Sequence, residues 1–185
     1  MKIYSIIKRL LMGPTIHKSI CFVMTEQTIN MDIFSLRNIS IEELYKEICD
    51  RVLVIRDNSV KYAFEEMCSD STAIIAKYCD TIVGHAVLKP WGIKGYQADF
   101  WMNKNYIHYC YVDPEYRGKG IYPYMLVYLA RKLFQKEDGS KIYIRADYKN
   151  YSSIRGIEKA GFKYWGILTE YGWGDIILFR RIRQI

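Results

Sequence analysis

Eleven residues near the middle of the chain, VDPEYRGKGIY at positions 112–122, join a hydrophobic segment to a helix-forming one through a short, basic turn. The preceding run, Tyr106–Val112, is rich in aromatic and β-branched residues, which favour a half-buried strand. Asp113 and Pro114 end that strand, and Pro123 suits the first turn of a helix, where its missing N–H costs nothing. The sequence therefore predicts a strand, a turn and a helix in succession.

This turn has the properties of an anion-binding site. Gly118 and Gly120 let the backbone approach a ligand closely, because no side chain intervenes. The helix that follows would direct its free N–H groups and the positive end of its dipole at the ligand, and Arg117 and Lys119 would add charge. We expect a pyrophosphate to bind here.

Two nucleotide-binding patterns are excluded. The chain has no GxxxxGK[ST] string, and a dinucleotide fingerprint would need a third glycine where Pro123 stands. The remaining pattern, Arg-x-x-Gly-x-(small) over residues 117–122, resembles the acyl-CoA pyrophosphate loop of the GNAT superfamily of N-acyltransferases. The segment NYSSIRGIEKAGF at 150–162 is similar to the second signature of that family, a short helix after a splayed strand.

The resemblance implies an α/β fold of the α+β type, with a mixed, mostly antiparallel central sheet, flanking helices and a splayed parallel strand pair. It implies that acetyl-CoA is the cosubstrate, that a primary amine attacks it directly, and that no metal takes part. The implied cofactor-binding residues are the main chain of Tyr111 and Val112, the loop residues Arg117, Gly118, Lys119, Gly120, Ile121 and Tyr122, and Asn150 and Ser153 of the second signature.

The chain departs from the family pattern at two positions. Tyr122 occupies the sixth position of the loop, where glycine or alanine is usual, so a bulky ring must lie beside the cofactor or turn away from it. Ile157 stands where many members place a tyrosine that protonates the departing CoA thiolate. Water, the amine itself, Tyr151 or Tyr122 would then have to supply that proton.

His108 is the predicted catalytic residue. Strand periodicity groups the side chains into two faces: Tyr106, His108, Cys110 and Val112 on one, and Ile107, Tyr109 and Tyr111 on the other. The ordinary pKa of histidine lies near neutrality, so His108 could relay a proton from an ammonium group, although a purely structural role between tyrosines is equally compatible. His85 and His17 are weaker candidates: we expect packing for His85, and His17 lies in an N-terminal stretch without a clear pattern.

Composition is consistent with a single domain over residues 1–185, made of a helical N-terminal part (1–70) and a cofactor-binding core (71–185). With 185 residues, half of them apolar, the chain can bury a sizeable core. Its five cysteines are odd in number and lack Cys-x-x-Cys spacing, which favours a reducing, cytoplasmic location. Residues 1–13 read as an amphipathic helix, with no membrane span.

Hydrophobic periodicity predicts the other elements in chain order. We expect strands at Ser19–Met24, Ser71–Tyr78, Thr81–Leu88, Lys141–Ala146, Lys163–Thr169 and Asp175–Arg183, helices at Ile41–Val54 (capped by Ser40 and Glu43), Val60–Met67, Pro123–Lys136 and Ser152–Ala160, a loop at Lys89–Asn105 and a turn at Tyr171–Gly174. Asn150 is expected to cap its helix and to contact the pantetheine arm of CoA, and Lys159 reads as a solvated lysine.

Several functions remain open at this point. The acceptor is expected to be a small-molecule amine, with an amino sugar as one candidate by analogy, and an amino acid, a peptide N-terminus or a lysine as others. A domain that binds acyl-CoA without turnover is the alternative that Tyr122 and Ile157 support. The net charge of +7 is compatible with nucleic-acid binding, but the basic residues are spread along the chain and we do not expect that partner.

Overall fold

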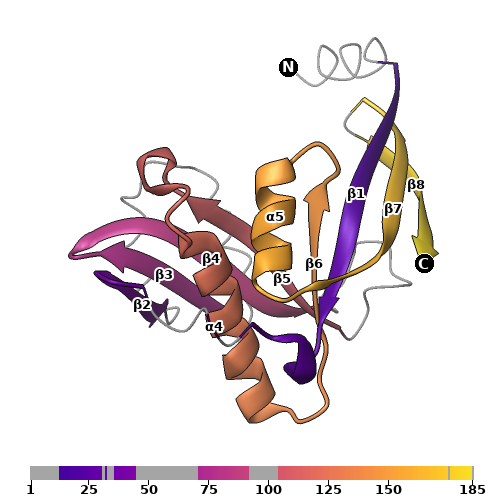
Figure 1. Ribbon diagram of the computed structural model, residues 1–185. Coiled ribbons are helices and arrows are strands. Elements are labelled where there is room, and N and C mark those ends of the chain that lie inside the picture. The colour runs from indigo at the N-terminus through magenta and orange to yellow at the C-terminus, as the bar shows by residue number, and fades with distance from the viewer. Residues whose placement is uncertain are drawn as a thin grey trace.

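The computed structural model of the protein describes residues 13–30, 32, 36–44, 71–91, 104–174 and 176–184. Within them, eight strands form one sheet in the order β2-β3-β4-β5-β6-β1-β7-β8, and helices α4 and α5 lie on the same face of it (Figure 1). The elements are β1 (Pro14–Met24), η1 (Glu26–Thr28), β2 (Ile39–Leu44), β3 (Thr72–Tyr78), β4 (Thr81–Trp91), β5 (Lys104–Val112), η3 (Pro114–Tyr116), α4 (Ile121–Lys136), β6 (Ile142–Asp147), α5 (Tyr151–Lys159), β7 (Lys163–Trp173) and β8 (Ile176–Gln184).

The strand pairings confirm the predicted mixed sheet. Neighbouring strands pair antiparallel except β5 and β6, which are parallel because α4 crosses between them. Their ladder is short, with only Asn105 opposite Ile142 and Tyr106 opposite Tyr143. Beyond Tyr106 the ladder between β5 and β6 ends, and the two strands diverge.

A bulge interrupts β5 at Tyr109, whose φ is +51°. His108 lies opposite Val87 and Tyr111 lies opposite His85, so β5 holds one residue more than β4 between these pairs. The extra residue reverses the side-chain alternation. The prediction that His108, Cys110 and Val112 share a face is therefore wrong: Cys110 and Val112 contact the core under α4, while His108 lies on the opposite face beside Tyr106.

Among the described residues, helix α4 makes most of the helix contacts with the sheet. Its buried stripe includes Met125, Leu126, Leu129 and Leu133, at the spacing that the sequence predicts for one helical face. Helix α5 buries Ile157 alone of its residues. The main core lies between these helices and the sheet, and a smaller cluster of Cys21, Tyr106, Tyr143 and Leu168 lies on the opposite face.

The N-terminal part differs from its prediction. Residues 39–44 form strand β2 against β3, so the helix expected from Ile41 does not begin there, and Ser40 and Glu43 are strand residues that cap nothing. The alternation of Ile39 and Ile41 with polar neighbours has the period of a strand, and pairing with β3 outweighs the helical spacing. Strand β1 also contradicts the expectation of a helical N-terminal part; it contains the expected Ser19–Met24 and begins earlier, at Pro14.

Elsewhere most predicted elements are present with shifted ends. The hairpin β3–β4, helices α4 and α5, and strands β6, β7 and β8 are confirmed. Strand β4 continues to Trp91 and β5 begins at Lys104, so both ends of the loop expected at Lys89–Asn105 are strand residues. Strand β7 continues to Trp173, through most of the turn expected at Tyr171–Gly174. The helix expected at 1–13, the later part of the one from Ile41, and that at Val60–Met67 fall outside the described residues. None of the helices in the described part of the chain has the length and apolar character needed to span a membrane.

Candidate functional site

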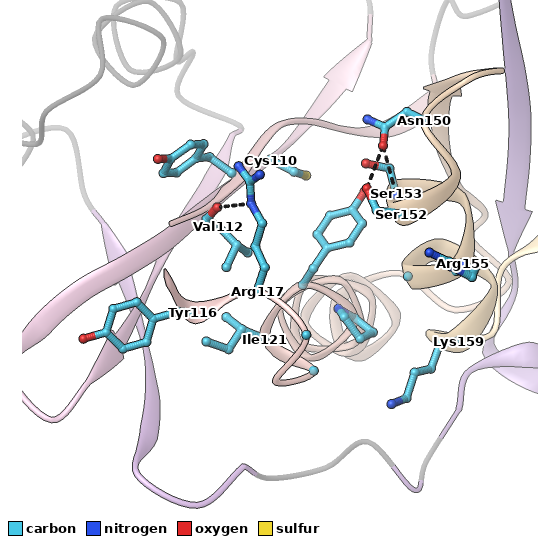
Figure 2. Close-up of a pocket in the computed structure, with 16 residues that line it drawn as sticks. Cys110, Val112, Tyr116, Arg117, Ile121, Asn150, Ser152, Ser153, Arg155 and Lys159 are labelled. Atoms are coloured by element: carbon cyan, nitrogen blue, oxygen red, sulfur yellow. Dashed lines mark hydrogen bonds between the residues drawn. The ribbon is translucent and has the colours of Figure 1, made fainter. Parts of the chain in front are cut away.

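A cavity of about 510 Å³ opens where β5 ends and α4 begins, with α5 forming its other wall (Figure 2). Three segments contribute to it: the last residues of β5, the turn into α4, and one side of α5. Its lining residues are Cys110, Tyr111, Val112, Tyr116, Arg117, Gly118, Gly120, Ile121, Tyr122, Pro123, Asn150, Ser152, Ser153, Arg155, Gly156 and Lys159. Nine of the ten predicted cofactor-binding residues are among them, and Lys119 is not.

The turn has the backbone conformation that its glycines predict. Gly118 and Gly120 both have positive φ, +79° and +80°, which favours glycine. Asp113 begins the turn by accepting a hydrogen bond from the Glu115 N–H through its Oδ1 at 3.0 Å. Gly120 is the N-cap residue of α4, and no side chain caps that end. Main-chain N–H groups at this end of the helix are therefore available to an anion.

Basic side chains flank the turn in different ways. The Arg117 Nε donates to the Val112 carbonyl at 2.9 Å, which folds the guanidinium back over the end of β5 (Figure 2). Arg155 and Lys159 approach the cavity from α5. Lys119 is exposed and lies over the Tyr116 ring, 4.6 Å from its centroid. The cavity therefore has a positive rim, and Arg155 belongs to it although sequence patterns did not single it out.

The second signature forms the wall on the α5 side. The Asn150 Oδ1 accepts hydrogen bonds from the Ser153 N–H at 3.1 Å and the Ser152 hydroxyl at 2.9 Å, which confirms the predicted cap (Figure 2). At the other end, Gly161 has φ +103°, and a Cβ there would lie 2.2 Å from the Thr28 carbonyl oxygen. This glycine therefore ends the helix and also lets it pack closely on the segment after β1.

Tyr122 lies in the first turn of α4 and packs across the cavity against α5. A Cβ on Gly156 would lie 2.5 Å from its Cδ1, so the ring occupies the space that a side chain on α5 would need. The Tyr122 hydroxyl hydrogen-bonds the Cys110 thiol of β5. Burial raises the pKa of the Cys110 thiol to about 12, so the thiol is neutral at physiological pH. A glycine inside a helical segment was the one sequence signal for this contact.

Residue 157, where many family members have a tyrosine, does not face the cavity in this chain. Ile157 is fully buried in the core and does not line the cavity. Tyr151, the first residue of α5, is 67% exposed and lies outside the cavity as well.

His108 is separate from the cavity. Its ring contacts Tyr106 and Tyr109, at centroid distances of 5.9 and 4.2 Å. Burial, with a contribution from the positive charge of Lys89, lowers the pKa of His108 to about 3, so its imidazole is neutral at physiological pH and not poised near neutrality as expected. His85 is buried and stacks on Tyr111, which fits the expected packing role.

A family model described as the acetyltransferase (GNAT) family matches residues 36–162, more than half of the chain. The chain belongs to the GNAT acetyltransferase family. A comparison with curated proteins found no match. Among the described residues, no three His, Cys, Asp or Glu side chains converge in the way that metal ligands do.

Solved structures share the GNAT fold at low sequence identity. A GCN5-related N-acetyltransferase-like protein from Streptococcus suis aligns with a TM-score of 0.60 and 15% identity over 92% of this chain and 66% of its own. A putative GNAT acetyltransferase from Novosphingobium aromaticivorans gives 0.59 and 14% over 85% and 65%. AAC(6')-Iy, in complex with the bisubstrate analogue CoA-S-monomethyl-acetylneamine, gives 0.53 and 15% over 80% and 99%. This chain spans between 55% and 66% of the first four solved structures that it matches.

Proposed function

We propose that this protein is an N-acetyltransferase that transfers the acetyl group of acetyl-CoA to a primary amine by direct attack. The observation that carries the proposal is the cavity at the start of α4, where a double-glycine turn, a free helix N-terminus and a positive rim meet the point at which β5 and β6 diverge. These features match the two ends of an acyl-CoA, because the molecule carries phosphates at one end and a thioester at the other.

The phosphate end would bind at the turn. Main-chain N–H groups around Gly118, Gly120 and Ile121 point their dipoles at an anion without a side chain in the way. Arg117, Arg155 and Lys159 add positive charge, and an anion of several charges is attracted more strongly than a single one. Lys119, which turns to Tyr116, contributes only through its long-range field.

The thioester end would reach the inner part of the cavity. Cys110, Tyr111 and Val112 line it, and β5 has no ladder with β6 beyond Tyr106, so main-chain N–H groups of this stretch could hold the thioester carbonyl and its oxyanion. Asn150 would contact the pantetheine arm from α5. Each of these groups is fixed by a strand or a helix cap, as precise positioning requires.

The amine would then approach from the opposite face of the sheet, where His108 is the proposed proton acceptor. The bulge at Tyr109 sets His108 on that face while Cys110 stays on the cavity side of the same strand. A neutral imidazole has a lone pair that can accept a proton from the amine. Because the pKa of His108 is low, the imidazole is a weak base and would pass this proton on to solvent.

For the acceptor we propose a small amine, and an amino sugar as the first class to test. AAC(6')-Iy shares the fold and was solved with an analogue that joins CoA to an acetylneamine. A protein or peptide amine is the second class. We also propose that the domain acts in the cytoplasm as a single unit over its whole length.

Binding of CoA is tested by thermal unfolding. A ligand that binds only the folded protein stabilises it by RT ln(1 + [L]/Kd), about 2.7 kcal/mol at a concentration of 100 Kd. Gly120→Val should abolish this stabilisation, because a β-branched residue cannot readily hold the left-handed φ of +80° that shapes the turn at the cavity. Gly139→Val is the matched control: Gly139 also has positive φ, with open space around it, but does not line the cavity.

Both variants should lose some intrinsic stability, since each forces a β-branched residue into a left-handed conformation, and only the control should keep the response to CoA. A wild-type protein that shows no thermal shift with millimolar CoA would contradict the proposal. If CoA binds but no amine in a panel that includes amino sugars, amino acids and peptides releases free CoA thiol from acetyl-CoA, the domain is a non-catalytic acyl-CoA-binding module.

A further inference from the structure

The proposed reaction requires stabilisation of the departing sulfur. When the amine nitrogen bonds to the thioester carbon, the C–S bond breaks and its electron pair moves to sulfur. A hydrogen-bond donor at that atom stabilises the developing negative charge, and buried donors are the most effective because water does not compete. If the proposed function holds, one residue of this chain has to be that donor.

Tyr122 is held at the inner part of the cavity by packing on both sides. Its backbone is fixed in the first turn of α4, and its ring fills the gap over Gly156, where even a methyl group would overlap it. A ring confined in this way has few alternative rotamers, so its hydroxyl has a defined position.

That position is at the end of β5 that lies beyond the bulge. The Tyr122 hydroxyl hydrogen-bonds the Cys110 thiol, and the thiol in turn lies 3.8 Å from the His108 carbonyl oxygen. Cys110 is also the cavity residue nearest in sequence to the point where the β5–β6 ladder ends. The hydroxyl therefore lies where a thioester entering between the two strands would place its sulfur, and Cys110 is a partner that the sulfur can replace.

Other hydroxyl groups near the cavity are less suitable. The Ser152 hydroxyl already donates to the Asn150 side chain. Tyr151 is mostly exposed and lies outside the cavity, and Ile157 is buried in the core without a polar atom.

We propose that the Tyr122 hydroxyl donates a hydrogen bond to the CoA sulfur as the C–S bond breaks, and that it keeps its own proton throughout. Sulfur leaves as the thiolate and takes its proton afterwards from solvent, while the proton lost by the amine passes to solvent through its own acceptor. Protons and electrons balance without any ionised tyrosine. Tyr122 is thus a catalytic residue that stabilises charge and is not an acid that gives up its proton.

The electrostatics of the site agree with this division. Burial, with the neighbouring Cys110 and Tyr106 groups, raises the pKa of Tyr122 well above its usual range. The phenol therefore stays protonated at any pH at which the protein works, whereas a thiol ionises far more readily; the reference pKa of a cysteine thiol is about 8.5.

The test measures how the protein binds CoA, so that it needs no knowledge of the acceptor. A hydrogen bond from Tyr122 favours the bound thiolate over the bound thiol and lowers the pKa of the bound thiol. The affinity for CoA, relative to that for desulfo-CoA, should then rise as the pH increases from the pKa of the bound thiol to that of free CoA. A shift of one pKa unit gives a total rise of about tenfold. Calorimetric titration of both ligands gives this ratio.

Tyr122→Phe, which keeps the ring and removes the hydroxyl, should lose most of that rise. Tyr124→Phe, on the same helix but outside the cavity lining, should keep it. Gly156→Ala, which displaces the ring and keeps the hydroxyl, should lose it as Tyr122→Phe does. With an active acceptor, Tyr122→Phe should also lower kcat by about 10- to 100-fold at unchanged acetyl-CoA affinity, as expected for loss of a transition-state hydrogen bond.

An equal rise in wild type and Tyr122→Phe would overturn the inference while leaving the proposed function intact. Absence of CoA binding to the wild type would overturn the proposed function itself. The dependence of kcat on pH gives a further check. If kcat of the wild type falls as the pH rises through an apparent pKa, and this fall is absent in Tyr122→Phe, then Tyr122 gives up its proton and the inference is wrong.

Discussion

The two faces of the sheet around β5 and β6 solve different physical problems. On the face covered by α4 and α5 the core contacts are apolar, and the Tyr128 hydroxyl of α4 donates to Glu43 of β2 beside them. The polar groups of the cavity are main-chain atoms, the Asn150 side chain that caps α5, and the basic side chains of its rim. On the opposite face, charged and aromatic side chains are buried together, with Glu170 only 7% exposed. One bulged strand serves both faces, because the bulge at Tyr109 directs Cys110 to the first and leaves His108 on the second. A single inserted residue can thus separate two chemical environments within one strand.

The opposite face is organised around Glu170. Its carboxylate accepts a hydrogen bond from the Arg180 Nε at 2.6 Å, and the Arg145 guanidinium lies 3.2 Å away. Burial opposes ionisation of Glu170, but the two arginines outweigh it and lower the pKa of the carboxyl below its usual value. The Tyr106 hydroxyl hydrogen-bonds Arg145 in turn. This face depends on charge neutralisation, whereas the cavity face depends on packing.

The largest effect on stability is expected from Glu170→Gln, which keeps the shape of the side chain and removes its charge. Two arginines would then be partly buried without a counter-charge, at a cost of about 3 kcal/mol in the free energy of unfolding. We place the cost at the low end for a buried ion pair, because the Arg145 side chain is 35% exposed. Denaturant unfolding of both proteins at pH 7 measures it.

Glu42→Gln is the matched control for this charge effect. Glu42 and Lys77 form a pair at 2.6 Å on the β2–β3 edge, where the Glu42 side chain is 49% exposed. Such a pair contributes up to about 1 kcal/mol. Equal losses in the two variants would mean that burial of Glu170 adds nothing to the pair, and the contrast between the faces would fail.

An intermediate effect is expected on the packed face from Ile157→Tyr. Because Ile157 is fully buried, the larger ring would overpack the core and cost about 1–3 kcal/mol, and its hydroxyl would not enter the cavity. Glu158→Tyr, one residue further along α5 and exposed, should change stability by about 0.5 kcal/mol or less. A fully stable Ile157→Tyr protein with a higher kcat would instead indicate that residue 157 reaches the cofactor.

The sequence was most informative where local rules and packing agree. From the turn at 112–122 to Gly161, glycine positions, the Asn150 cap and the apolar stripe of α4 all fit the structure, because each depends on neighbours a few residues away. The glycine turn at 117–122 and the segment at 150–162 therefore line one cavity.

Features that depend on distant partners were missed. Nothing local in YIHYCYV specifies that Tyr109 is the bulged residue, since the bulge is defined by register against β4, and this one residue reversed the predicted faces. Strand β2 forms because β3 is available to pair with it, whereas the spacing from Ile41 and the capping pattern of Ser40 and Glu43 suggested a helix. The contact between Tyr122 and Gly156 joins helices whose facing sides cannot be known before the helices are placed.

The smallest effect at neutral pH is expected for His108→Gln, about 1 kcal/mol, and the informative quantity is its dependence on pH. The pKa of His108 is lowered by burial among Tyr106, Tyr109 and Lys89 from 6.5 to about 3, so between these values the unfolded chain binds a proton that the folded protein does not. Stability of the wild type should therefore be complete above pH 6.5 and fall as the pH decreases towards 3, and His108→Gln should lack this part of the fall. Because Glu170 loses its own contribution only below its reference pKa of about 4.5, the window between pH 4.5 and 6.5 isolates His108. Parallel stability curves for the two proteins across that window would mean that His108 is accessible to water and outside the buried aromatic group, and its place on the face opposite the cavity would need revision.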